Sequence, residues 1–186
     1  MKKYNFFIVF LLFFLSACSV KAPLYSSDYS SLDILSSYNL KKISVATVEP
    51  SDPKAGVNKI KLRSSTMIAQ QGTFSAYLED ALKADLIDAK LFDQSSEIKL
   101  YATIIKNDIK LPIKDGRGVM EVNFILKDNR EIYNKLILVT TNFESFFGGT
   151  FAIPKGMQEY PNLVRALIKK LFLDKEFINA LKQENM

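Results

Sequence analysis

The sequence has 186 residues, 48% of them hydrophobic, and its 25 lysines and arginines against 20 aspartates and glutamates give a formal net charge of +5. It contains one cysteine and no histidine, which excludes an intramolecular disulfide and zinc sites built from His and Cys. The basic residues are interspersed with acidic ones and form no tract, so we expect no nucleic-acid partner.

The first 17 residues have the layout of an export signal. Lys2 and Lys3 form a short basic end, and residues 6–15 form an unbroken apolar run. A helix needs roughly 20 apolar residues to cross a bilayer, so this run is too short for a permanent span. Leu15-Ser16-Ala17-Cys18 then places the only cysteine directly after the run. The alternatives are an ordinary secretory signal with a chance cysteine and a short signal anchor.

This four-residue motif resembles the lipobox of bacterial lipoproteins. The resemblance implies that Leu15, Ser16 and Ala17 are the residues recognised for processing and that residues 1–17 are removed as a signal peptide. It also implies that Cys18 carries a diacylglycerol thioether and an N-acyl chain such as palmitate. We therefore expect the membrane as a partner through this anchor, and no other cofactor and no metal.

The resemblance also suggests a location. In many Gram-negative bacteria an aspartate after the lipidated cysteine keeps a lipoprotein in the inner membrane, and Ser19 occupies that position here. This favours the outer membrane, with the domain facing the periplasm. A Gram-positive origin would instead place the anchor in the cytoplasmic membrane.

Residues 18–39 are rich in serine and tyrosine and hold few charges, which predicts a lipidated N-terminus followed by a tether. A flexible chain of about 20 residues spans on the order of 25 Å and would hold the domain clear of the lipid. The alternative is that Leu32, Ile34 and Leu35 dock on the domain as a short strand or helical turn.

Residues 40–186 show no repeat and no second linker, which predicts a single domain. A β-branched run at 41–48 predicts a buried strand, 49–58 a loop and 57–64 a second strand. Apolar residues at helical spacing from Phe74 to Leu82 predict a helix with Thr73 as its cap. We assign its solvent-facing side to Glu79, Asp80, Lys83 and Asp85.

The second half of the domain predicts three strands and a helix. Alternating patterns at 97–110, 117–126 and 131–141 favour antiparallel strands, with a turn at 127–130. A helix follows over 154–172, where Pro161 kinks it or begins a new one, and Asp174 caps a terminal turn. The fold class is therefore α+β, with a mainly antiparallel sheet of about four to five strands and two principal helices packed on one face.

No residue pattern predicts catalysis. Histidine, the commonest general base, is absent, and the Ser-x-x-Lys spacing of Ser51 and Lys54 resembles penicillin-binding proteins and serine β-lactamases without their companion motifs. The carboxylate pairs, Glu79 with Asp80 and Asp85 with Asp88, are typical of a solvated helix face. We expect no catalytic residue and no enzyme.

An aromatic segment is the main candidate for binding. Phe143, Phe146, Phe147 and Phe151 surround Gly148-Gly149, whose backbone freedom suits a tight connection. Either these rings fill the core, or they form an exposed rim that docks a partner protein or a lipid chain. Residues 108–118 form a second candidate surface, for which a mobile turn between strands is the plain alternative.

The layout of the whole domain resembles small periplasmic α/β lipoproteins that serve envelope machines, such as lipopolysaccharide-assembly lipoproteins, auxiliary lipoproteins of lipid transporters and activators of wall synthases. The residues behind this are 74–82, 86–89 and 160–181. The resemblance implies a non-catalytic binding or scaffolding domain, accessory to an envelope assembly or transport complex, with an envelope protein as partner. The alternatives are a cell-wall or glycan hydrolase or lyase, and a periplasmic lipid carrier.

Overall fold

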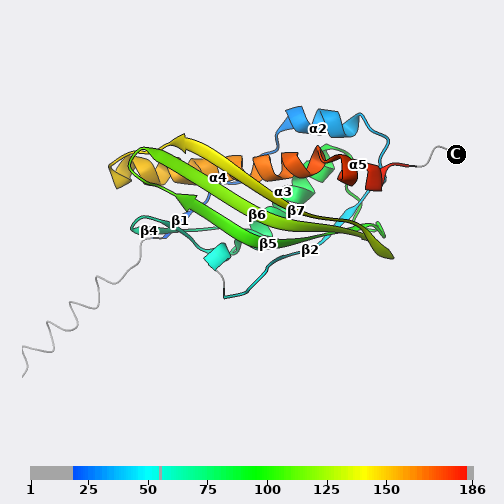
Figure 1. Ribbon diagram of the computed structural model, residues 1–186, viewed down its shortest axis with the longest axis horizontal. Coiled ribbons are helices and arrows are strands. Elements are labelled where there is room, and N and C mark those ends of the chain that lie inside the picture. The colour runs from blue at the N-terminus through cyan, green and yellow to red at the C-terminus, as the bar shows by residue number, and fades with distance from the viewer. Residues whose placement is uncertain (1–18, 55, 184–186) are drawn as a thin grey trace, which may run out of the picture.

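A four-stranded sheet forms the centre of the protein (Figure 1). The computed structural model describes residues 19–54 and 56–183. The strand order is β2-β5-β6-β7, with β2 at Ser44–Pro50, β5 at Lys99–Lys110, β6 at Asp115–Asp128 and β7 at Arg130–Glu144. β2 is parallel to β5, and the two long hairpin pairings are antiparallel. The predicted, mainly antiparallel α+β fold is confirmed.

Two principal helices cover one face of this sheet, as predicted. α3 (Phe74–Asp88) packs against β2, and α4 (Gly149–Phe172) packs against β7 and β6. The Thr73 side chain accepts a hydrogen bond from the Ala76 N–H and caps α3. Asp174 caps α5 (Lys175–Leu181) in the same way, by accepting from two backbone N–H groups. Both caps were readable from the sequence.

Two predictions about α4 were wrong: that it begins at Pro154, and the alternative that a new helix begins at Pro161. The helix begins at Gly149 rather than Pro154, because Gly148 is extended and its carbonyl accepts the Ala152 N–H. It then runs through Pro161 without a break. A proline removes one backbone hydrogen bond from the helix. The apolar stripe on both sides of Pro161 is buried against the sheet, and the free energy gained by this burial exceeds the cost of the lost hydrogen bond.

A second, small sheet lies beside the first and was only partly predicted. It has the order β1-β4-β3, with β1 at Ser19–Lys21, β3 at Ile60–Leu62 and β4 at Ser65–Ile68. A short 3₁₀ turn at Gly56–Asn58 precedes β3. β1 is parallel to β4, so residues immediately after Cys18 join the fold.

Of the two alternatives for the segment up to residue 39, the structure shows the docked one. α2 (Tyr29–Ser36) lies on the outer side of α3 and α4, with Leu32 and Leu35 buried and Ile34 exposed (Figure 1). The tether prediction failed because a serine-rich composition hides two apolar residues three apart, which is enough to seat one helical face.

Hydrogen bonds fasten the chain between β1 and α2 to the helices. The Tyr25 hydroxyl donates to Asp85 Oδ2 at 2.7 Å, and the Tyr77 hydroxyl donates to the Pro23 carbonyl at 2.9 Å. Arg165 donates to the Ser26 carbonyl at 2.9 Å. Asp85 is therefore buried and not on the solvent side of α3, which corrects the sequence assignment. Burial raises the pKa of Asp85, and burial together with the Asp85 hydrogen bond raises the pKa of Tyr25.

Candidate binding surface

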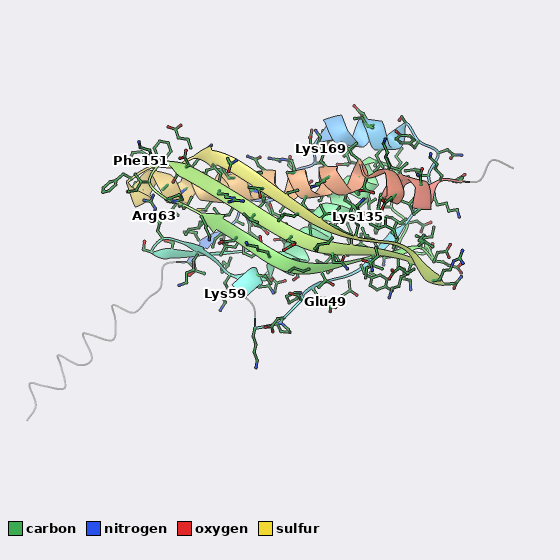
Figure 2. All side chains as sticks on the ribbon, in the orientation of Figure 1. Glu49, Lys59, Arg63, Lys135, Phe151 and Lys169 are labelled. Atoms are coloured by element: carbon green, nitrogen blue, oxygen red, sulfur yellow. The ribbon has the colours of Figure 1, made fainter. Side chains whose placement is uncertain are left out.

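The two candidate segments of the sequence meet at one end of the molecule, which we call the tip. The tip comprises the β5–β6 connection at 111–114 and the β7–α4 connection at 145–148, with the first turn of α4. The Ser145 N–H donates to the Lys114 carbonyl at 2.7 Å, which joins the two connections. Figure 2 shows Phe151 and Arg63 together at this end, away from Lys135 and Lys169.

Arg63 holds the tip together. This residue lies in the turn between β3 and β4 with a φ of 54° and comes from the small sheet. Its guanidinium donates to the carbonyls of Leu111 at 3.0 Å, Pro112 at 3.2 Å and Phe147 at 2.5 Å, and also to the carbonyl of Phe146. One planar, permanently charged group thus fixes the backbones of both connections.

Two glycines also support the tip, because each lets a large apolar side chain pack directly against the backbone. A Cβ on Gly116 would lie 2.1 Å from the ring of Phe143, its neighbour across β6 and β7, so only glycine lets that ring lie flat there. A Cβ on Gly156 of α4 would lie 2.8 Å from Leu111 Cδ2. Phe143 and Leu111 are therefore seated in the fold, and they anchor the tip from below.

The remaining apolar side chains of the tip face solvent. Phe147 is 81% exposed, Phe151 68% and Ile113 59%, and Phe146 is 38% exposed with its ring centroid 6.2 Å from that of Phe151. Of the four phenylalanines, then, Phe143 packs against the core and the other three form an exposed rim. Gly148 is the N-cap of α4 in a short connection from β7, and its φ of −77° is one that any residue adopts.

Basic residues outnumber acidic ones around the tip. The exposed basic side chains of the tip and the adjoining strands are Lys61, Arg63, Lys110, Lys114 and Arg117. The acidic side chains there are the exposed Asp115 and Glu144 and the half-buried Asp108. Asp108 is partly matched by Lys110 at 3.8 Å. A shallow hollow at the tip is lined by charged and apolar residues, among them Lys61, Arg63, Asp108, Lys110 and Pro112. The tip is thus an apolar surface with a basic border.

The residues considered for catalysis do not converge in the described part of the chain. Ser51 and Lys54 are exposed in the loop after β2, where the Lys54 N–H donates to Asp52 Oδ1 at 2.8 Å in a local turn. Glu79 pairs with Lys83 at 2.6 Å, and Asp85 is engaged by Tyr25. Glu79 and Asp85 are therefore held in structural contacts.

A second hollow lies at the junction of α4 and α5 and is lined by charged residues. Lys135 there contacts Asp174 at 2.7 Å and Glu176 at 3.2 Å. Burial pushes the pKa of Asp174 upward, but hydrogen bonds from Lys135 and the α5 N–H groups outweigh it and lower the pKa. The ion pairs of Lys135 join β7 to the start of α5, which accounts for the charged residues in this hollow.

The lipobox residues Leu15, Ser16, Ala17 and Cys18 lie outside the described residues. No helix in the described part of the chain is long and apolar enough to cross a membrane.

Sequence reasoning missed Arg63, since an exposed arginine in a short turn carries no local signal. A positive φ at a non-glycine residue is the feature that marks it once the backbone is known.

No family model and no curated protein matches the chain. Its fold is similar to that of a Xanthomonas campestris protein of the DUF330 family, with a TM-score of 0.53 and 12% identity over 83% of this chain and 95% of that one. A candidate lipoprotein from Caulobacter crescentus aligns with a TM-score of 0.47 and 16% identity over 81% and 96% of the two chains. A minor lipoprotein from Acinetobacter baumannii aligns with a TM-score of 0.45 and 12% identity over 77% and 97%. The first likeness shows a shared fold.

Proposed function

We propose that this protein is a lipid-anchored component of the bacterial envelope whose domain binds another envelope component without catalysing a reaction. In this proposal Cys18 carries the acyl chains, the outer membrane holds the anchor and the domain faces the periplasm. The protein then acts as an accessory to an envelope assembly or transport complex.

The exposed rim of Phe146, Phe147 and Phe151 is the observation that carries the proposal. Large apolar side chains are costly to leave in water, and a cluster held in place by buried anchors is typical of a contact surface. Arg63 keeps the rim ordered before anything binds, which lowers the entropy cost of binding. The surface offers contact area and charge.

The two alternative functions find less support in the described residues. The space between the sheet and the helices, where a carrier would hold lipid, is filled by fully buried side chains such as Phe74, Phe124 and Phe172. A hydrolase would need two carboxyls converging across a cleft, and the buried Asp85 is instead bonded to Tyr25.

The test of the anchor uses Cys18→Ser in the full-length protein, with Ser19→Ala as the matched control. Processing and membrane fractionation are measured in cells, and intact mass reports the added acyl chains. We expect the control to keep the lipid mass and the membrane location, and Cys18→Ser to lose both. Unchanged fractionation of Cys18→Ser would disprove the anchor.

The test of the binding surface is a crosslinking pull-down from intact cells with the lipidated protein. Phe147→Ser with Phe151→Ser is compared with Leu136→Ser with Leu138→Ser, which changes two exposed apolar residues of β7 outside the tip. We expect the tip variant to lose crosslinked material and the β7 variant to retain it. Crosslinked protein and crosslinked lipid are both identified by mass spectrometry. Equal capture of protein and of lipid by both variants contradicts a binding role for the tip.

A further inference from the structure

The chain enters the fold at the tip. Ser19 is the first residue of β1, and it pairs with Thr66 in β4, three residues after Arg63. Arg63 in turn contacts the carbonyls of Phe146 and Phe147. In Figure 1, β1 and β4 lie at the same end of the molecule as the beginning of α4. Ser19, the residue that follows Cys18, therefore lies at the same end of the molecule as the exposed phenylalanines.

Little slack separates the anchor position from the folded domain. Successive Cα atoms are about 3.8 Å apart, so Cys18 lies one residue from a strand that is hydrogen-bonded into the small sheet. The chain after β1 is fastened as well, since the Ala22 N–H donates to the Ile68 carbonyl at 2.9 Å and Gln70 donates to the Ala22 carbonyl at 3.1 Å. An anchored domain with this geometry lies directly on the surface that holds its anchor.

The chemistry of the tip suits a lipid surface. Phenylalanine and isoleucine side chains partition into the boundary between head groups and acyl chains, and lysines and arginines at its border attract anionic head groups. Phe147, Phe151 and Ile113 supply the first feature, and Lys61, Lys110 and Lys114 the second. The acidic residues Asp108, Asp115 and Glu144 weaken this attraction. The five basic residues around the tip against these three leave a formal charge of +2.

We infer that the tip inserts Phe147 and Phe151 into the lipid surface of the membrane to which Cys18 anchors the chain. This rests on the proposed function, and it names lipid as the component that the exposed rim contacts. The acyl chains supply the affinity, and the tip fixes the orientation of the domain, with α4 rising from the bilayer. The open face of the sheet is then held at a set angle to the membrane.

The absence of tryptophan from the sequence gives a direct test. Phe147→Trp introduces the only indole into the full-length, lipidated protein, at a side chain that is 81% exposed. The matched control is Ile87→Trp, because Ile87 is 56% exposed and lies near the end of α3. The chain just after α3 pairs with Ile43, at the end of the molecule opposite the tip. Both variants are reconstituted into vesicles of phosphatidylethanolamine and phosphatidylglycerol that contain phospholipid brominated near the carbonyl end of its acyl chains.

We expect the Phe147→Trp emission to shift to shorter wavelength on reconstitution and to be quenched at least roughly twofold more strongly than that of Ile87→Trp. Phe151→Trp should behave like Phe147→Trp, which guards against an effect of one substitution on the local fold. Replacing phosphatidylglycerol with phosphatidylcholine should reduce the quenching at both tip positions, because the basic border loses its anionic partner.

Three outcomes overturn the inference in distinguishable ways. Equal quenching of Phe147→Trp and Ile87→Trp in a protein whose intact mass includes the acyl chains refutes the inference and leaves the anchor standing. A photo-crosslinker at position 147 that captures protein in cells, with no quenching by brominated lipid, shows a protein contact in place of lipid. A chain without added lipid mass overturns the proposed function and the inference together.

Discussion

Two groups of aromatic side chains lie in opposite surroundings in this protein. In the interior, Phe74, Tyr77 and Tyr160 pack ring to ring, with centroid separations of 4.6 Å and 5.2 Å from Tyr160, and each is fully buried. At the tip, Phe147 and Phe151 are mostly exposed, and their backbones rather than their rings are fixed. Rings that stabilise the fold are thus separated in space from rings held out for contact, and stability and binding should respond to different substitutions.

The largest expected effect is in the interior group. Tyr160→Ala removes a fully buried ring and should lower the free energy of unfolding by about 3–5 kcal/mol, measured by urea denaturation. Tyr160→Phe keeps the ring and loses only the hydroxyl that accepts from Asn107 at 3.1 Å, so its cost should be about 1 kcal/mol. A tolerated Tyr160→Ala would contradict the division between the two groups.

The next effect concerns the support beneath the tip. Arg63→Ala removes a charged donor to several carbonyls and should cost about 1–3 kcal/mol, with faster amide hydrogen exchange confined to residues 111–114 and 145–148. Exchange should be equally fast in Arg63→Lys, because the compact lysine ammonium cannot reach the carbonyls of both connections at once. Lys61→Ala, an exposed neighbour in β3, serves as the control. Exchange that is unchanged by Arg63→Ala would show that the tip is ordered by other contacts.

A smaller, pH-dependent effect is expected at Asp85. The raised pKa means that the folded protein holds this proton more tightly than the unfolded chain does, so the contribution to stability is full below the ordinary pKa of an aspartate and is lost as the pH rises through the raised value. Asp85→Asn keeps an oxygen that accepts from Tyr25 and does not ionise. The variant should therefore gain stability relative to the original protein as the pH rises to neutrality, measured by denaturant titration at several pH values. A difference that stays constant with pH would show that Asp85 titrates normally in the fold.

The smallest effect on stability is expected at the tip itself. Phe147→Ser with Phe151→Ser should change the free energy of unfolding by less than about 0.5 kcal/mol, since both rings are mostly in water. The same variant should lose the lipid that crosslinks to the tip in intact cells, which mass spectrometry of the crosslinked material measures. Strong destabilisation by this pair would mean that the rings pack within the fold and would remove the basis of the binding surface.

The comparison also shows which parts of the fold could be read from the sequence. The caps at Thr73 and Asp174 and the β6–β7 turn, where Asn129 has a φ of 55°, depend on neighbours within a few residues, and local patterns identified them. The three-residue strands β1 and β3 and the four-residue strand β4 are too short to show a period of two, so only a part of that sheet was predicted.

The aromatic segment was identified because four phenylalanines around two glycines are unusual in any context. Whether each ring is buried was decided by distant residues. Phe143 is seated because Gly116 lies opposite it in β6, and Phe146 and Phe147 are held outward because Arg63 reaches their carbonyls from another sheet.

The sequence alone determined the fold class, the principal helices and strands, and the motif at Cys18, because these depend on periodicity, caps and short-range spacing. The tertiary structure decided that Asp85 is buried, that residues after Cys18 join a sheet instead of forming a tether, and that two separate candidate segments form one tip. Each of these depends on pairings between residues that are about 30 or more positions apart, such as Ser145 with Lys114 and, at a separation of 60, Tyr25 with Asp85. A local pattern carries no information about such a pairing, since the energy that selects it arises only when the whole core assembles.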